Sequence, residues 1–192
     1  MVNDDDEEKA WRYVGRFLQD FARLEIQIDE LFRAVFGLKD WGALLLQKAL
    51  HIGQKINLTE TGVGRQGLDY EDIFNQVRHH QQLRNVIAHC YFNGEELAGG
   101  IDFLHYEART GKLKSLPGND GDTLLQYVTL DELHEEASRL TLRLEEAVEE
   151  CTPQQFDGHE DVRRAIVAAL DLAESNIVPF PVRRTRAQDE EV

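Results

Sequence analysis

Acidic residues are missing from one stretch of a chain that is otherwise rich in them. The 192 residues include 36 Asp and Glu, and the formal net charge is -15. An even distribution would place about four acids in any window of twenty residues. Residues 75–94, NQVRHHQQLRNVIAHCYFNG, contain none, but they carry two arginines and three histidines. We therefore expect a local site for an anion on this stretch.

Other scarcities limit the class of protein. A pI near 4.8 argues against broad, nonspecific binding to duplex nucleic acid, which needs a basic surface. The two cysteines, Cys90 and Cys151, form no disulfide framework or metal cluster and suit a reducing cytoplasm. No apolar run approaches the roughly eighteen residues of a membrane helix, and the acidic start MVNDDDEEKA is unlike a signal peptide. We expect a cytoplasmic protein that needs no membrane, metal or cofactor.

The apolar periodicity predicts that residues 75–94 belong to one long helix. At about 100° per residue, one stripe of this helix is apolar except for His80 and Arg84 in its middle. The apolar members of the stripe are Ile73, Val77, Ile87 and Tyr91. A second line of side chains, one per turn, is entirely polar, and we call it the polar row. It consists of Arg78, Gln82, Asn85 and His89.

The segment Arg84-Asn85-Val86-Ile87-Ala88-His89 resembles the R-N-x-x-x-H signature of HEPN domains. That all-helical family includes many RNA-cleaving toxins and host-defence ribonucleases. As in the family, the motif lies late in a long helix that follows two amphipathic helices. Family members often have Gly after the histidine, where this chain has Cys90. The resemblance covers residues from about 10 to 150.

The resemblance implies a metal-independent endoribonuclease that leaves a 2′,3′-cyclic phosphate, as a toxin or a defence component. The implied catalytic residues are Arg84, Asn85 and His89. Histidine exchanges protons near neutral pH, and a guanidinium can bridge two phosphoryl oxygens. We expect Arg78 and Gln82, together with Arg65 on the preceding loop, to bind the substrate RNA. One histidine does not easily serve as both base and acid, and HEPN nucleases typically dimerise, so a homodimer is implied.

Other classes of function remain open. A HEPN-like domain can keep the motif for ligand contact or dimer structure without cleaving, and the acidic composition favours such a non-catalytic, dimeric binding or regulatory module. A third hypothesis is a structural helical dimer, in which Arg84 is a hydrogen-bonded core residue. An antitoxin or a nucleotidyltransferase is a further candidate partner. His79 and His80 lack a second cluster of metal ligands, so we expect no metal site there.

The remaining pattern predicts a mainly α fold, a HEPN-like antiparallel helical bundle with a small β-hairpin insertion after the motif helix. Apolar residues from Trp11 to Val35 predict a first long helix that ends at Gly37. A second helix is expected from Asp40 to about Ile56. Residues 62–67, GVGRQG, have the G-x-G-x-x-G spacing, but a helix precedes them, so we interpret them as a flexible connector.

Beyond the motif the pattern changes to β-structure. Two short strands are predicted over 101–108 and 113–116, with a turn between them, and a third over 124–128. Thr129-Leu130-Asp131-Glu132 is a capping box that should open the next helix.

We expect three regions along the chain. Residues 1–8 form an acidic, disordered lead-in, and residues 9–175 a single domain with the β insertion at about 99–128. A further helix is predicted between about 153 and 174. A flexible tail follows over 176–192.

Overall fold

The computed structural model describes residues 4–38, 48–89, 91–92, 99–104, 106–107, 111–119 and 121–151. The chain divides into two units, Met1–Gln155 and Phe156–Val192. All of the described residues belong to the first unit. The predicted helix over 153–174 and the predicted tail over 176–192 lie outside the described residues.

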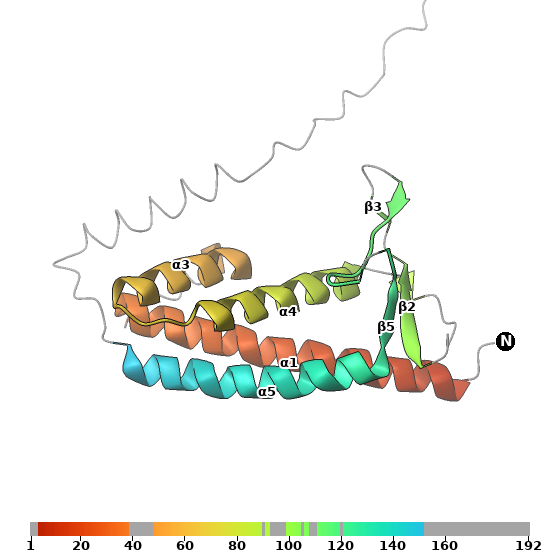
Figure 1. Cartoon of the computed structure of the whole chain (residues 1–192), viewed down its shortest axis with the longest axis horizontal. Coiled ribbons are helices and arrows are strands. Elements are labelled where there is room, and N and C mark those ends of the chain that lie inside the picture. The colour runs from red at the N-terminus through yellow and green to blue at the C-terminus, as the bar shows by residue number, and fades with distance from the viewer. Residues whose placement is uncertain are drawn as a thin grey trace, which may run out of the picture. The chain divides into compact units, whose positions relative to one another are not determined.

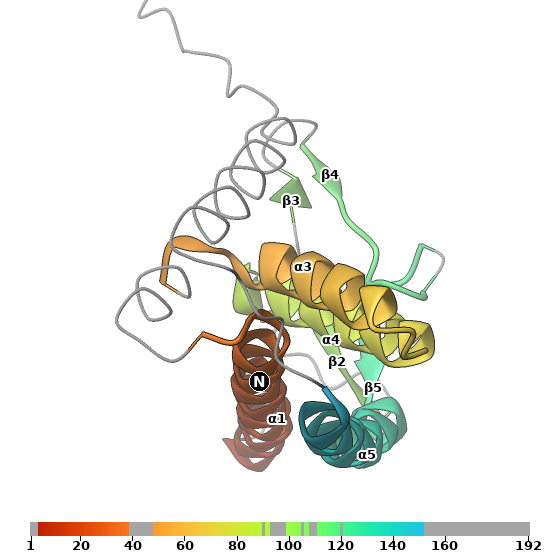
Figure 2. The same ribbon diagram turned by 90° about the vertical axis from the view of Figure 1, so that its left-hand side faces the viewer.

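The described part of the chain is mainly helical, as predicted, and its helices form two layers. The helices are α1 (Asp4–Phe36), α3 (Ile52–Arg65), α4 (Glu71–His89) and α5 (Tyr127–Glu150). Helices α1 and α5 lie side by side, and α3 and α4 lie across them as a second layer (Figures 1 and 2). The strands are gathered at the end of the helices where α4 finishes and α5 starts.

Helix α1 begins earlier than the sequence predicted. Residues 4–8, expected to be part of a disordered lead-in, are helical. In this first part of the helix, Glu7 accepts a hydrogen bond from Trp11 and Glu8 pairs with Arg12, each one turn further along. The predicted end is confirmed, since α1 ends at Phe36 and Gly37 follows with a φ of 60°. Trp11, expected on the apolar stripe, is 54% exposed.

Helices α1 and α5 run parallel to each other. Three hydrogen bonds between them advance in the same direction along both helices: Tyr13 to Asp131, His134 to Asp20, and Gln27 to Glu145. The predicted antiparallel arrangement is therefore wrong for α1 and α5. It is correct for α3 and α4, which a short turn joins and which run in opposite directions (Figure 1). The strands return the chain to the end where α1 also starts, which makes α5 parallel to α1 (Figure 1).

The G-x-G-x-x-G segment is not a connector. Helix α3 continues through Gly62 and Gly64 to Arg65, and the turn comes at Gly67, with a φ of 78°. A Cβ atom at Gly62 would lie 2.3 Å from Cγ1 of Val35 in α1. Glycine at this position lets the two helices approach closely, so their packing offsets the low helix propensity of glycine.

The predicted β-structure is confirmed in outline and is made of two small antiparallel sheets. Its strands are β1 (Tyr91–Phe92), β2 (Gly100–Leu104), β3 (Tyr106–Glu107), β4 (Lys112–Leu113) and β5 (Leu124–Gln126). The order in the first sheet is β1-β2-β5, and β3 pairs with β4 as a hairpin. The helix ends at His89, and β1 starts at Tyr91. Tyr91 was predicted to belong to the apolar stripe of the helix, and this prediction was wrong because the residue lies in a strand.

Helix α5 starts two residues before the predicted capping box. Its first residue is Tyr127, and Gln126 is the N-cap. The N–H of Tyr127 donates to the carbonyl of Gly99 at 2.9 Å, so the strand pairing continues into the first helical residue and fixes the start there. The apolar spacing of this helix predicts a buried stripe of Leu133, Ala137, Leu140, Leu144 and Val148; the first four are buried, and Val148 is partly buried.

Helix α4 contributes to both apolar clusters of the core. Its first half, with Ile73 and Val77, packs in a cluster with α3 and the second halves of α1 and α5. Its second half, with Leu83, Val86 and Ile87, packs with the strands and the first halves of α1 and α5. These contacts fix the rotation of α4 about its axis. No helix of the described residues is long and apolar enough to cross a membrane.

Candidate functional site

His80 and Arg84, the two polar residues in the otherwise apolar stripe of α4, both lie on the side of the helix that faces α1. His80 is buried, with 1% of its surface exposed, and Arg84 is half-buried. Each faces a phenyl ring of α1. The His80 ring stacks on Phe17, with centroids 5.9 Å apart and an angle of 13°, and Cζ of Arg84 lies 5.9 Å from the centroid of Phe21.

Arg78 is engaged within the protein. Its guanidinium forms an ion pair with Glu60 of α3 and donates to Oδ1 of Asn57 at 3.0 Å and to Oδ1 of Asn75 at 3.1 Å. Arg78 was predicted to bind substrate, and in the structure these three contacts hold its guanidinium against α3 and α4. Residues 75–94 contain no acid, but the antiparallel pairing of α3 with α4 brings the carboxylate of Glu60 opposite Arg78.

Arg84 differs from most arginines of the described chain because no described carboxylate pairs with it. Its Nη1 donates to Oδ1 of the neighbouring Asn85 at 3.3 Å. Arginines that do pair with a carboxylate are Arg12, Arg16, Arg23, Arg33, Arg78, Arg139 and Arg143. In a chain with 36 acids against 21 basic residues, a half-buried guanidinium without an acid is available to an external anion.

The other two residues of the motif are accessible. Asn85 and His89 are exposed, one turn apart on α4, and His89 is in the last turn. Gln82, one turn before Asn85 on the polar row, is exposed as well. The predicted catalytic residues thus share the C-terminal half of α4, and a ligand can reach the amide and the imidazole from solvent.

Arg65 is exposed but lies far from this group. It occupies the last turn of α3, and a short turn connects it to the start of α4 at Glu71. From Glu71 to His89 the helix rises about 27 Å at about 1.5 Å per residue. Arg65 was expected to hold substrate from a loop, but it is helical and stands at the opposite end of α4. It cannot reach a phosphate that contacts His89 of the same protomer.

His80 is held neutral inside the protein. Burial lowers its pKa below the usual 6.5, while the nearby Glu136 carboxylate acts in the opposite direction. Nε2 of His80 lies 3.4 Å from Oε2 of Glu136, but the atom has no hydrogen-bond partner. The described residues include no group of three or more His, Cys, Asp or Glu arranged to hold a metal ion.

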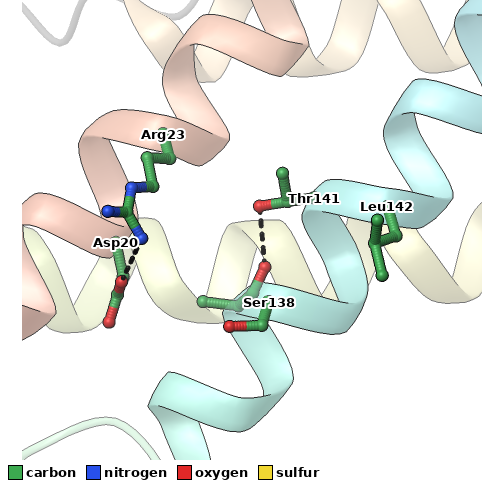
Figure 3. Close-up of a pocket in the computed structure, with 6 residues that line it drawn as sticks. Asp20, Arg23, Ser138, Thr141 and Leu142 are labelled. Carbon is green, nitrogen blue, oxygen red and sulfur yellow. Dashed lines mark hydrogen bonds and ion pairs between the residues drawn. The ribbon is translucent and has the colours of Figure 1, made fainter.

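A surface hollow of about 280 Å³ lies between α1 and α5, and no residue of the motif lines it (Figure 3). Asp20 and Arg23 face each other across 3.5 Å on the α1 side. On the α5 side, the hydroxyl groups of Ser138 and Thr141 donate to backbone carbonyls of their own helix at 3.0 and 2.8 Å. None of these residues was predicted to be functional, and their polar groups are satisfied by internal contacts.

The contacts that distinguish Arg84 from Arg78 were not predicted. Phe21 was part of the first helix's apolar pattern and Glu60 followed a predicted helix, but neither pattern indicates which residue of α4 it faces. The ion pair of Glu60 with Arg78 could have been suspected from the sequence, because an acid on the helix before α4 is a candidate partner for an arginine in a stretch without acids.

No family model, curated protein sequence or solved structure matches this chain. The likeness to HEPN domains therefore rests on the six residues of the motif and on the helical context in which they lie.

Proposed function

We propose that this protein is a metal-independent endoribonuclease with Arg84, Asn85 and His89 as its catalytic residues. The observation that carries the proposal is the half-buried guanidinium of Arg84, which no carboxylate of the described residues neutralises and which is hydrogen-bonded to Asn85, one turn before the exposed His89. A phosphodiester is the anion that these groups fit best, because a guanidinium binds its oxygens and an imidazole can move the protons of the reaction.

In the proposed reaction the 2′-hydroxyl loses its proton to an imidazole, and its oxygen attacks the adjacent phosphorus. The P–O5′ bond breaks, the 5′-oxygen takes up a proton, and the products are a 2′,3′-cyclic phosphate and a 5′-hydroxyl. Arg84 stabilises the charge that accumulates on the phosphoryl oxygens, and Asn85 orients the imidazole or the phosphate. A homodimer belongs to the proposal, since a second copy of His89 would supply the acid while the first acts as the base.

The test is RNA cleavage in the presence of EDTA by wild type, His89→Ala and Arg84→Ala, with the product ends analysed for cyclic phosphate. We expect both variants to lose cleavage by about a hundredfold or more, as losses of proton-transfer and charge-stabilising groups usually do. Arg139→Ala is the matched control, because Arg139 is exposed on α5 and its loss changes the net charge by the same amount. Cleavage by His89→Ala at the wild-type rate would refute the proposal.

One observation favours a second candidate, a module that binds an anionic ligand without cleaving it. Arg78 is paired with Glu60, and Arg65 lies at the other end of α4, so a single protomer offers the ligand only Arg84 of the three arginines predicted to act. For this candidate, well-folded wild type binds RNA through Arg84 but leaves every RNA tested intact. RNA turnover by wild type that disappears in His89→Ala would exclude it.

A further inference from the structure

We infer that Phe21 is the positioning residue for Arg84, holding the guanidinium in place by a cation–π contact that leaves its charge free for the RNA phosphate. The inference rests on the proposed function, because it names what makes Arg84 available to an anion. Phe21 is not part of the R-N-x-x-x-H motif and lies on a different helix, 63 positions earlier in the chain.

The contact follows from the packing of α1 against α4. Phe17 and Phe21 are one turn apart on α1, and both are buried, with 3% and 2% of their surface exposed. They face His80 and Arg84, which are one turn apart on α4. The first ring meets a neutral imidazole and the second a guanidinium, so of these two rings Phe21 is the one that contacts a cation of the motif.

The choice of partner matters for the function of an arginine. A carboxylate fixes a guanidinium but neutralises it, which is the situation of Arg78 beside Glu60. An aromatic face attracts the cation through its quadrupole, keeps the side chain extended, and leaves the N–H groups free to donate. The hydrogen bond to Asn85 uses one Nη, and the rest of the guanidinium edge remains available to phosphate oxygens.

The experiment measures binding of a 2′-O-methylated single-stranded RNA, which cannot be cleaved, to the full chain. The variants are Phe21→Leu, the same position carrying a ring-fluorinated phenylalanine, and Phe17→Leu as the matched control. Phe21→Leu should weaken RNA binding by about two- to fivefold, which is the size of a cation–π contact at a partly exposed site. The fluorinated ring, equal in shape but with a weaker quadrupole, should weaken binding in the same direction without lowering the unfolding temperature.

Phe17→Leu should destabilise the protein as much as Phe21→Leu does, because both rings are buried to the same degree, but it should leave RNA affinity unchanged. A loss of affinity that is equal in the two leucine variants, or absent with the fluorinated ring, would overturn the inference and leave Phe21 with a packing role only.

A readout without RNA separates this inference from the proposed function. In the NMR spectrum, the Nε–H proton of Arg84 should carry a ring-current shift that Phe21→Leu removes and Phe17→Leu does not. If wild type binds no RNA, the proposed function fails, and this shift alone decides whether Phe21 positions Arg84. If the Nε–H shift is the same in wild type and Phe21→Leu, the inference is wrong even where RNA binding is found.

Discussion

Replacing Gly62 by alanine would force a methyl group into the contact between α3 and α1. The new Cβ would lie 2.3 Å from Cγ1 of Val35, a side chain that is itself fully buried. Carbon atoms normally approach to about 3.5 Å, so α3 must move by about 1 Å or Val35 must leave its packed position. Overpacking of this kind destabilises by about 1–3 kcal/mol, and alanine regains up to about 1 kcal/mol in helix propensity. We expect a net loss of about 2 kcal/mol, given the severity of the overlap.

Gly64 provides the matched control on the same helix. It is exposed, and a Cβ added there meets nothing within 4 Å, so Gly64→Ala should stabilise by up to about 1 kcal/mol. For a chain of this size, the thermal midpoints of the two variants should differ by roughly 6–12 °C, measured by circular dichroism. Equal midpoints would refute the reasoning, because they are the result expected if residues 62–67 were an unpacked connector.

Two further predictions concern titration and charge. Because burial holds the pKa of His80 below its value of about 6.5 in the unfolded chain, the native state should be most stable above that pH and lose stability as the pH falls below it. Urea unfolding at about pH 7.5 and about pH 5.5 should show a larger loss for wild type than for His80→Gln, and equal losses would assign the effect to other groups. Glu60→Gln should release Arg78 from its ion pair and raise RNA affinity about twofold at low salt, with a steeper salt dependence. An unchanged affinity in a binding titration would place Arg78 outside the path of the RNA.

Periodicity was sufficient to predict which side of α4 is buried. Because a helical repeat fixes the direction of each side chain, the burial of Ile73, Val77 and Ile87 followed from the sequence, whereas Arg84, placed in the middle of the same stripe, is only half-buried. The exposure of Asn85 and His89 followed in the same way, because they lie on the opposite line of side chains. The prediction was wrong at Tyr91, since the chain turns into a strand after the helix and helical geometry no longer applies.

Contacts between elements could not be predicted, because they depend on how helices pair rather than on local spacing. The absence of acids from residues 75–94 suggested an open basic face, yet Glu60 reaches Arg78 from α3 and Glu136 approaches His80 from α5. The helical conformation at Gly62 also depends on a contact between two helices. Local propensity disfavours it, and the close approach of α1 stabilises it. The roles of Arg84, Asn85 and His89 stay predictions of the motif until activity is measured.

The parallel pairing of α1 with α5 has a consequence for how the protein is made. Among the described elements, α1 packs most extensively on α5, although residues 37–126 separate them in the chain. Closing so long a loop slows folding, because chain entropy is lost before the contact forms. During synthesis, α1 leaves the ribosome before α3, α4 and α5, and the part of its apolar surface that packs on α5 stays uncovered until α5, which ends at Glu150, has followed. The side of α1 that packs on α5 is therefore covered after the sides that pack on α3 and α4, and it is where a nascent or truncated chain would be most exposed to chaperones and to aggregation.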